Sequence, residues 1–113
     1  LSLHDALPIL KAKCRDGFCP FGPQLVPAQE IADPHALELK LYVNGELRQR
    51  NNTANLVRDI PRLIAEISEF MTLHAGDVLI TGTPEGRVDV HPGDRVEVEI
   101  DGLGRLTNSI VAE

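Results

Sequence analysis

The sequence lacks the features that would place the protein in a membrane, on nucleic acid or outside the cell. No apolar run approaches the roughly 20 residues that span a bilayer, and residues 1–10 carry an acid where a signal peptide has basic residues. Eleven basic residues stand against seventeen acidic ones, and the net charge of −6 repels phosphate backbones and anionic lipids. We therefore expect a soluble, cytoplasmic protein with no nucleic-acid or membrane partner.

Cysteine is also scarce, with only Cys14 and Cys19 in the chain. Two closely spaced cysteines neither form a secreted disulfide framework nor complete a zinc site, so reduced thiols are expected. An alternative makes Cys14 a nucleophile, because Lys13 and Arg15 would favour its thiolate. No histidine is placed to act as its base, and we favour a structural role. All four histidines lie on expected loops without ligand spacing, which predicts surface positions: His4, His35, His74 and His91.

A β-hairpin is the clearest local signal. Apolar and polar residues alternate from Leu37 to Val43, and the run stops at Asn44-Gly45, a pair that tolerates the positive φ angles of a type I′ turn. The return strand, residues 46–50, has Leu47 as its one apolar residue. We expect it to lie at a sheet edge or to face water.

Between residues 55 and 73 the apolar period changes from two to nearly four, which predicts one amphipathic helix over residues 61–71. Asp59 suits the N-cap and Pro61 the first turn. The apolar stripe is expected to pack as core, since a sheet-rich chain this short needs a covering element.

Two turns have similar sequences, residues 74–77 and 91–94, and each precedes an expected strand. Four strands are expected besides the hairpin: 24–26, 78–80, 96–100 and 105–111.

The most informative stretch is Thr81-Gly82-Thr83-Pro84-Glu85-Gly86, which follows the apolar run Val78-Leu79-Ile80. A buried strand that ends in glycine and hydroxyl-bearing residues brings backbone N–H groups and hydroxyls to one point. Such donors suit a carboxylate or an enolate oxygen, so a substrate pocket is expected here. The same residues also suit a structural role, in which Gly82 permits a bend and Thr83 ends a strand.

Four segments stand in the order and spacing of the fumarylacetoacetate hydrolase family, which the sequence resembles from Lys11 to Glu113. They are Lys13-Cys14-Arg15-Asp16-Gly17-Phe18-Cys19-Pro20, Tyr42-Val43-Asn44-Gly45-Glu46, residues 64–73 and residues 81–86. The chain is most similar to the isomerase/decarboxylase branch of 4-hydroxyphenylacetate (homoprotocatechuate) catabolism. The resemblance implies a mainly β (α+β) fold, the mixed β-roll of the family's C-terminal domain with one amphipathic helix, incomplete in this chain.

The resemblance implies decarboxylation of 5-oxopent-3-ene-1,2,5-tricarboxylate and isomerisation of 2-hydroxyhepta-2,4-diene-1,7-dioate. Both reactions develop negative charge on an oxygen, which a divalent cation, Mg²⁺ or Mn²⁺, stabilises in the family. Carried over by position, Lys13 is the catalytic, substrate-binding lysine, and Gly82 and Thr83 contact the substrate. Lys13 and Thr83 are thus expected to meet at one anionic intermediate. Arg15 and Asp16 fall in the lysine motif as further candidates.

The resemblance also implies metal ligands, a Glu-x-Glu pair and a further acid, upstream of Lys11, where this sequence does not supply them. Glu97-Val98-Glu99 and the acids of residues 66–69 belong to other elements. We therefore expect residues 11–113 to be the C-terminal portion of a longer catalytic domain and residues 1–10 to be a foreign leader. The chain alone is expected to be inactive, poorly folded and a weak Mg²⁺ binder. The complete enzyme is expected to be a homodimer or larger assembly that binds a small carboxylate substrate.

Two alternative functions stay open. One is an acylpyruvate-type carbon–carbon bond hydrolase of the same superfamily. The other is a noncatalytic β-domain that binds a small acid or a partner strand through an exposed edge.

Overall fold

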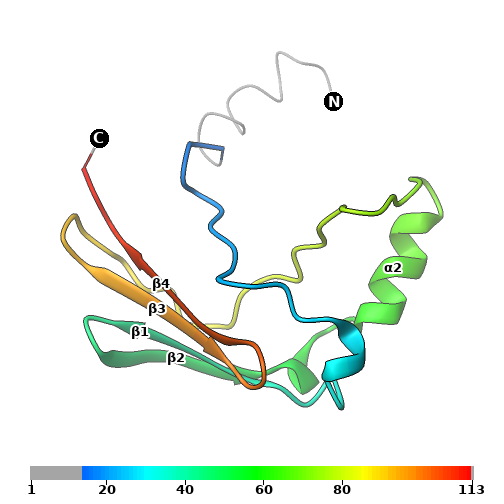
Figure 1. The fold of residues 1–113 in the computed structure, drawn as a ribbon, viewed down its shortest axis with the longest axis horizontal. Helices are drawn as coiled ribbons and strands as arrows, with labels where there is room; N and C mark the ends of the chain where they lie inside the picture. The colour runs from blue at the N-terminus through cyan, green and yellow to red at the C-terminus, as the bar shows by residue number, and fades with distance from the viewer. Residues whose placement is uncertain (1–13, 113) are drawn as a thin grey trace.

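A four-stranded antiparallel sheet organises the chain (Figure 1), with strand order β2-β1-β3-β4. The structure is a computed structural model that describes residues 14–112. The strands are β1 (Glu38–Val43), β2 (Glu46–Asn52), β3 (Arg95–Ile100) and β4 (Gly104–Ser109). With one α-helix beside this sheet, the predicted mainly β fold is confirmed. The predictions for residues 1–10 and for Lys13 lie outside the described residues.

The β1–β2 hairpin forms where the sequence predicts it. Asn44 and Gly45 both have positive φ, 52° and 83°, as a type I′ turn requires. Strand β2 lies at the sheet edge, as expected from its single apolar residue. Leu41 pairs with Gln49 and Tyr42 pairs with Leu47, so Arg48 is an extra residue that forms a β-bulge.

The sheet has one apolar and one polar face. Residues that pair directly across antiparallel strands share a face, so the strand register places these side chains together. The apolar face carries Leu39, Leu41, Val43, Val96, Val98, Ile100 and Leu106. The opposite face carries Glu38, Lys40, Tyr42, Glu97, Glu99, Arg105 and Thr107.

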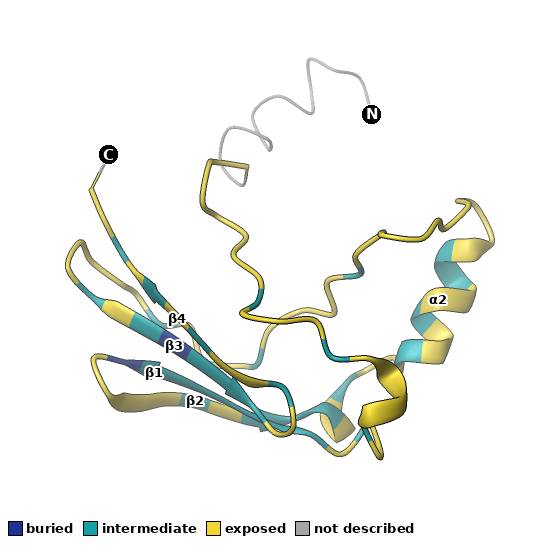
Figure 2. Ribbon diagram, in the orientation of Figure 1, coloured by how far each residue is buried: buried dark blue, intermediate teal, exposed yellow. Residues whose placement is uncertain are grey.

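Little of the described chain is buried (Figure 2). Val43, with 6% of its surface exposed, is the one buried hydrophobic residue among residues 14–112. The accessible surface is 9,097 Å², whereas a compact monomer of this size has about 6,100 Å². The fold is therefore open, and most apolar side chains keep contact with solvent.

Helix α2 (Ile60–Ser68) begins as predicted and ends early. The Asp59 carboxylate accepts a hydrogen bond from the Arg62 backbone N–H at 2.9 Å, which confirms the N-cap, and Pro61 lies in the first turn. The N–H groups of residues 70 and 71 both bond to the Ile67 carbonyl, a tightened final turn in place of continued helix. The expected core packing is wrong, because α2 lies to one side of the sheet (Figure 1) and contains no buried residue.

Two predicted strands do not form. Residues 24–26 and 78–80 are irregular, and Leu25 and Ile80 are 92% and 74% exposed. The apolar runs supply strand propensity, but no neighbouring strand among the described residues completes a hydrogen-bonded ladder with them. Strand β4 also ends at Ser109, two residues before the predicted end.

The two similar turns share one hydrogen-bond pattern. In each, an aspartate accepts from the histidine N–H three residues earlier, His74 to Asp77 at 2.7 Å and His91 to Asp94 at 2.9 Å. Only the second turn leads into a strand, β3, so the prediction is half right.

Within residues 14–112, no helix has the length and apolar character that crossing a bilayer requires.

Candidate functional site

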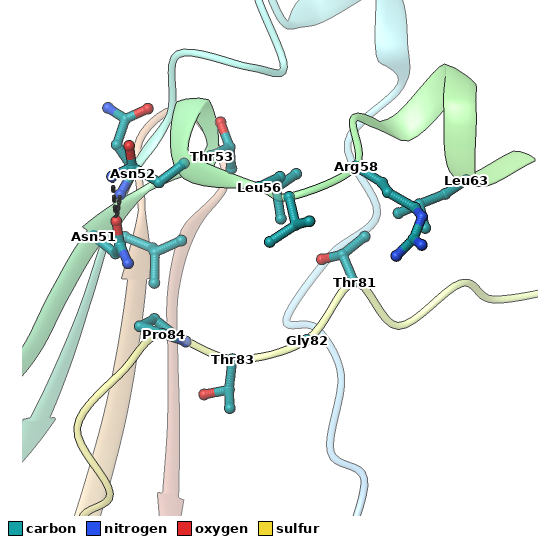
Figure 3. A pocket seen from close by; sticks show the side chains of 13 residues that line it. Asn51, Asn52, Thr53, Leu56, Arg58, Leu63, Thr81, Gly82, Thr83 and Pro84 are labelled. Carbon is teal, nitrogen blue, oxygen red and sulfur yellow. Dashed lines mark hydrogen bonds between the residues drawn. The ribbon is translucent and has the colours of Figure 1, made fainter.

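A cavity of about 280 Å³ lies between the residue 81–84 loop, the end of β2 and the chain that enters α2 (Figure 3). This volume is near the lower end of the roughly 300–1,000 Å³ typical of small-molecule sites. The described residues that line it are Leu39, Asn51, Asn52, Thr53, Asn55, Leu56, Val57, Arg58, Leu63, Thr81, Gly82, Thr83 and Pro84. The predicted pocket motif thus lines a cavity suited to a small ligand.

The loop presents its two threonines to opposite sides. In Figure 3 the Thr81 side chain points toward Leu56 and Arg58, whereas the Thr83 side chain points away from them. Gly82 between them has φ 101°, which side-chain-bearing residues rarely adopt, and a Cβ there would meet no atom within 4 Å. The loop is tied to β2 by a hydrogen bond from the Gln49 side chain to the Gly86 carbonyl.

Asparagine amides line the other end of the cavity. The Asn51 Oδ1 accepts from Asn55 Nδ2 at 2.6 Å and from the Asn52 N–H at 2.8 Å. The Asn52 Oδ1 accepts from the Ala54 N–H at 2.9 Å and caps the 3₁₀ helix η2 (Thr53–Asn55). In these bonds both amide oxygens accept, and the Nδ2 groups of Asn51 and Asn52 donate to no partner among the described residues.

Arg58 is the one charged side chain among the described residues that line the cavity. Its Nε lies 3.0 Å from Glu66 Oε2, and Arg62 Nε lies 3.1 Å from Oε1 of the same carboxylate. Figure 3 shows the guanidinium extending from the start of α2 toward the residue 81–84 loop. The described lining residues offer one cation, amide donors and hydroxyls, and none of them is an acid. The cavity therefore suits an anion.

The surface position predicted for His35 is wrong. It is half-buried, and its Nε2 accepts the Ile60 N–H at 3.1 Å. Together with Asp59 it therefore satisfies donors at the start of α2 and fixes the approach to the cavity. His74 and His91 are exposed, as predicted, and His4 lies outside the described residues.

Two further predicted site residues, Arg15 and Asp16, do not line this cavity. Arg15 and Asp16 are exposed, in a turn closed by a 3.1 Å bond from the Phe18 N–H to the Arg15 carbonyl, and are absent from the described lining. Lys13 lies outside the described residues, so its approach to Thr83 stays a prediction. Cys14 and Cys19 are exposed free thiols.

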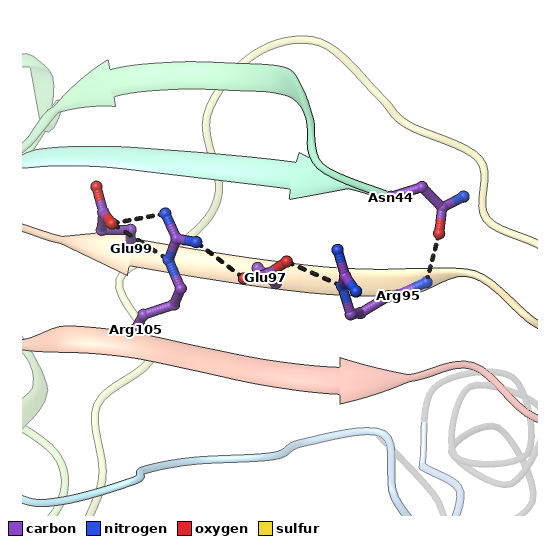
Figure 4. A network of polar contacts seen from close by, with 5 residues as sticks. All are labelled: Asn44, Arg95, Glu97, Glu99 and Arg105. Atoms are coloured by element: carbon purple, nitrogen blue, oxygen red, sulfur yellow. Dashed lines mark hydrogen bonds and ion pairs between the residues drawn. The ribbon is translucent and has the colours of Figure 1, made fainter.

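The described residues do not fit a divalent cation. Residues 14–112 contain no group of three His, Cys, Asp or Glu side chains arranged to hold a metal. Glu97 and Glu99 are both engaged by arginine (Figure 4), with Arg105 at 3.0 Å from Glu97 and 2.8 Å from Glu99, and Arg95 at 3.0 Å from Glu97. The Glu99 carboxylate raises the pKa of the Arg105 guanidinium, which stays charged.

Sequence reasoning found the loop but missed the opposite wall. In the sequence, Arg58 lies on the polar side of the helical segment and Asn51 begins a glycosylation acceptor pattern, and neither feature indicates a substrate site. The signal that could have found them is a cluster of polar residues at the end of a strand, directly before a capped helix. Thr81 begins the residue 81–86 motif, and the sequence indicates no separate role for it.

Comparison with known proteins gives consistent matches along the chain. A family model described as fumarylacetoacetate (FAA) hydrolase C-terminal matches residues 2–111. The 4-hydroxyphenylacetate degradation bifunctional isomerase/decarboxylase of Salmonella dublin is 55% identical over 106 residues, 94% of this chain and 25% of that protein. The mitochondrial oxaloacetate tautomerase Fahd2a of Rattus norvegicus is 45% identical over 109 residues, 90% of this chain and 35% of that protein.

A solved structure is similar in both fold and sequence. The crystal structure of maleylpyruvate hydrolase from Sphingobium sp. SYK-6, in complex with manganese(II) and pyruvate, matches with a TM-score of 0.83 and 48% identity over 85% of this chain and 36% of that one. This chain thus spans between a quarter and about a third of the length of these relatives.

Proposed function

Because the chain belongs to the fumarylacetoacetate hydrolase family, we propose that it supplies part of the substrate site of an enzyme acting on 2-oxo acids and their 2-hydroxy dienoic forms. The observation that carries the proposal is the cavity, in which the glycine and the hydroxyl-bearing residues of the residue 81–84 loop meet no acid among the described lining residues. A site with this charge pattern favours a carboxylate and the enolate that forms beside it.

The proposed reaction is decarboxylation of 5-oxopent-3-ene-1,2,5-tricarboxylate and isomerisation of 2-hydroxyhepta-2,4-diene-1,7-dioate. The identity of 54% to 55% to three bifunctional isomerase/decarboxylases, over 94% of this chain, supports this choice. In the proposed site the Gly82 N–H donates to the substrate, the Thr83 hydroxyl donates to it on the side of the loop away from Arg58 (Figure 3), and the Lys13 ammonium donates to its carbonyl or carboxylate. Arg15 and Asp16 are proposed as outer residues of the same motif.

A carbon–carbon bond hydrolase is the second candidate. Two maleylpyruvate hydrolase structures, 47% and 48% identical to this chain, favour it. Both reactions start from a 2-oxo acid unit and differ in the bond that breaks, so product analysis separates them. Release of carbon dioxide indicates the decarboxylase, whereas release of pyruvate from an acylpyruvate indicates the hydrolase.

We also propose Mg²⁺ or Mn²⁺ as the cofactor of the natural protein, supported by the manganese(II) in the maleylpyruvate hydrolase structure. Since the described residues offer no ligand set, the ligands would come from outside residues 14–112. A cytoplasmic location and a homodimer or larger assembly complete the proposal.

The test uses the natural protein that contains this chain. Enolisation is measured as exchange of the C3 hydrogens of a 2-oxo acid in D₂O, and decarboxylation as carbon dioxide release. Lys13→Ala is expected to abolish turnover, and Thr83→Val to reduce it, because each removes a donor to the developing anion. Unchanged turnover in Lys13→Ala would overturn the proposal and favour a noncatalytic acid-binding domain.

A further inference from the structure

We propose that Arg58 binds a second, distal carboxylate of the substrate and thereby selects dicarboxylic over monocarboxylic 2-oxo acids. This inference rests on the proposed function and assigns a specificity-determining residue to its site. It is carried by the charge of the cavity, by the way Arg58 is held and by the distribution of polar and apolar groups along the cavity.

The charge of the described lining comes from Arg58 alone. Its hydrogen bonds to Glu66 use Nε, at 3.0 and 3.3 Å, and its two Nη groups have no partner among the described residues. An arginine with both Nη groups available binds a carboxylate through two parallel hydrogen bonds. The end of the cavity next to Arg58 therefore suits a carboxylate more than a neutral polar group.

Glu66 holds Arg58 in place without cancelling its charge. One carboxylate is shared by two guanidinium groups, Arg58 and Arg62, so the three side chains together keep a net charge of +1. Arg58 is 51% exposed at its side chain, and solvent therefore reaches the pair and weakens it. The Glu66 carboxylate thus holds Nε of Arg58, and the guanidinium extends toward the loop that carries Thr81 (Figure 3).

The cavity also has polar groups toward both of its ends, with apolar side chains between and beside them. In Figure 3 Asn51, Asn52 and Pro84 lie toward one end, Arg58, Leu63 and Thr81 lie toward the other, and Leu56 lies between. Leu39 and Leu63 add further apolar lining. A short carbon chain with a polar group at each end matches this distribution. A monocarboxylate that binds through its 2-oxo acid unit leaves Arg58 without a charged partner.

The experiment compares 2-oxoglutarate with 2-oxopentanoate in the natural protein. The two substrates have the same number of carbons and differ in the terminal carboxylate. Arg58→Gln is expected to raise the KM for 2-oxoglutarate about 10- to 100-fold, the loss typical of a hydrogen bond to a charged group, and to leave C3 exchange of 2-oxopentanoate unchanged. Arg58→Lys is expected to recover part of the preference, because it keeps the charge without the paired donors.

Arg62→Gln is the matched control. Arg62 contacts the same Glu66 carboxylate but is not among the described lining residues of this cavity. Arg62→Gln removes one charge from the cluster and no donor from the cavity, so it should leave 2-oxopentanoate unaffected and weaken 2-oxoglutarate binding less than Arg58→Gln does. An equal loss for both substrates in Arg58→Gln, or no change for either, would overturn the assignment. An Arg62→Gln effect as large as that of Arg58→Gln would also overturn it.

Failure of the proposed function gives a different result. It would appear as absence of C3 exchange with either substrate in the wild-type protein. Arg58 is then tested by calorimetric titration with glutarate against butyrate. Tighter binding of glutarate that disappears in Arg58→Gln supports the inference, and equal binding by both proteins overturns it.

Discussion

Replacing Gly82 by alanine tests the loop at the centre of the candidate site. At φ 101° an alanine is strained, and strain of this kind costs about 1–3 kcal/mol. The added Cβ meets no atom within 4 Å, so the cost comes from the backbone and not from a clash. In the free protein the alanine-bearing loop can relax to a conformation without strain. Substrate binding then requires the strained conformation again, so the cost of the strain appears in kcat/KM. Converted at 1.36 kcal/mol per tenfold, the expected loss in kcat/KM is about 5- to 150-fold.

The control for this variant is Gly86→Ala. Gly86 lies in the same loop region at φ 96°, also has no atom within 4 Å of a built Cβ, and does not line the cavity among the described residues. The assay is C3 hydrogen exchange of a 2-oxo acid by the natural protein, followed by NMR. Because Gly86 meets the same strain but holds the loop only through its carbonyl, we expect Gly86→Ala to lose clearly less kcat/KM than Gly82→Ala. Equal losses in the two variants, or none in Gly82→Ala, would refute the reasoning that ties Gly82 to the substrate.

Three further predictions concern stability and metal binding. Asp59→Ala removes the acceptor for the Arg62 N–H and should destabilise α2 by about 1 kcal/mol. Amide hydrogen exchange should then be faster in the helix, and Asp59→Asn, which keeps an acceptor oxygen, serves as the control. The hydrogen bond from Asn44, followed by the His91 N–H, lowers the pKa of Asp94. Because the folded pKa lies below the unfolded one, the stabilisation is present above the usual carboxyl value of about 3.9 and is lost as the pH falls through the folded value. An NMR titration should show this pKa rising toward its ordinary value in Asn44→Ala, and an unchanged value would count against the assignment. Calorimetric titration of the 113-residue chain with MnCl₂ should show no stoichiometric site, since the described residues hold no suitable cluster; a one-to-one micromolar site would contradict this.

The parts of the fold that sequence predicted are those encoded by neighbouring residues. Asn44-Gly45 specifies its own turn through positive φ, and Asp59 with Pro61 specifies the start of α2. These features need no distant partner. They came out at the predicted positions because local backbone chemistry decides them.

The parts that sequence missed depend on distant residues. Val78-Leu79-Ile80 has the composition of a strand, but a strand also needs a paired neighbour, and none of the described residues supplies one. Arg58 and Thr81 are 23 positions apart, and only the path of the chain after α2 brings both to one cavity. The family resemblance located the loop but carried no information on its opposite wall.

The exposed apolar residues keep one prediction open. Phe70, Val78 and Ile80 are exposed among the described residues, and together with the sparse core they give the isolated chain apolar surface that favours self-association. Poor folding of the chain alone therefore stays a prediction, and size-exclusion chromatography of the 113-residue chain measures it. A monomer with a sharp, reversible thermal transition would contradict it.

The bulge at Arg48 has a consequence for how the sheet meets other molecules. An exposed edge strand offers unpaired N–H and C=O groups on which another chain can add as a further strand. In β2 the extra residue interrupts the regular spacing of those groups and increases the local twist, and two arginines, Arg48 and Arg50, place charge along the same edge. Fibril-like growth from the β2 edge is thereby disfavoured, even though the fold buries little of its apolar surface.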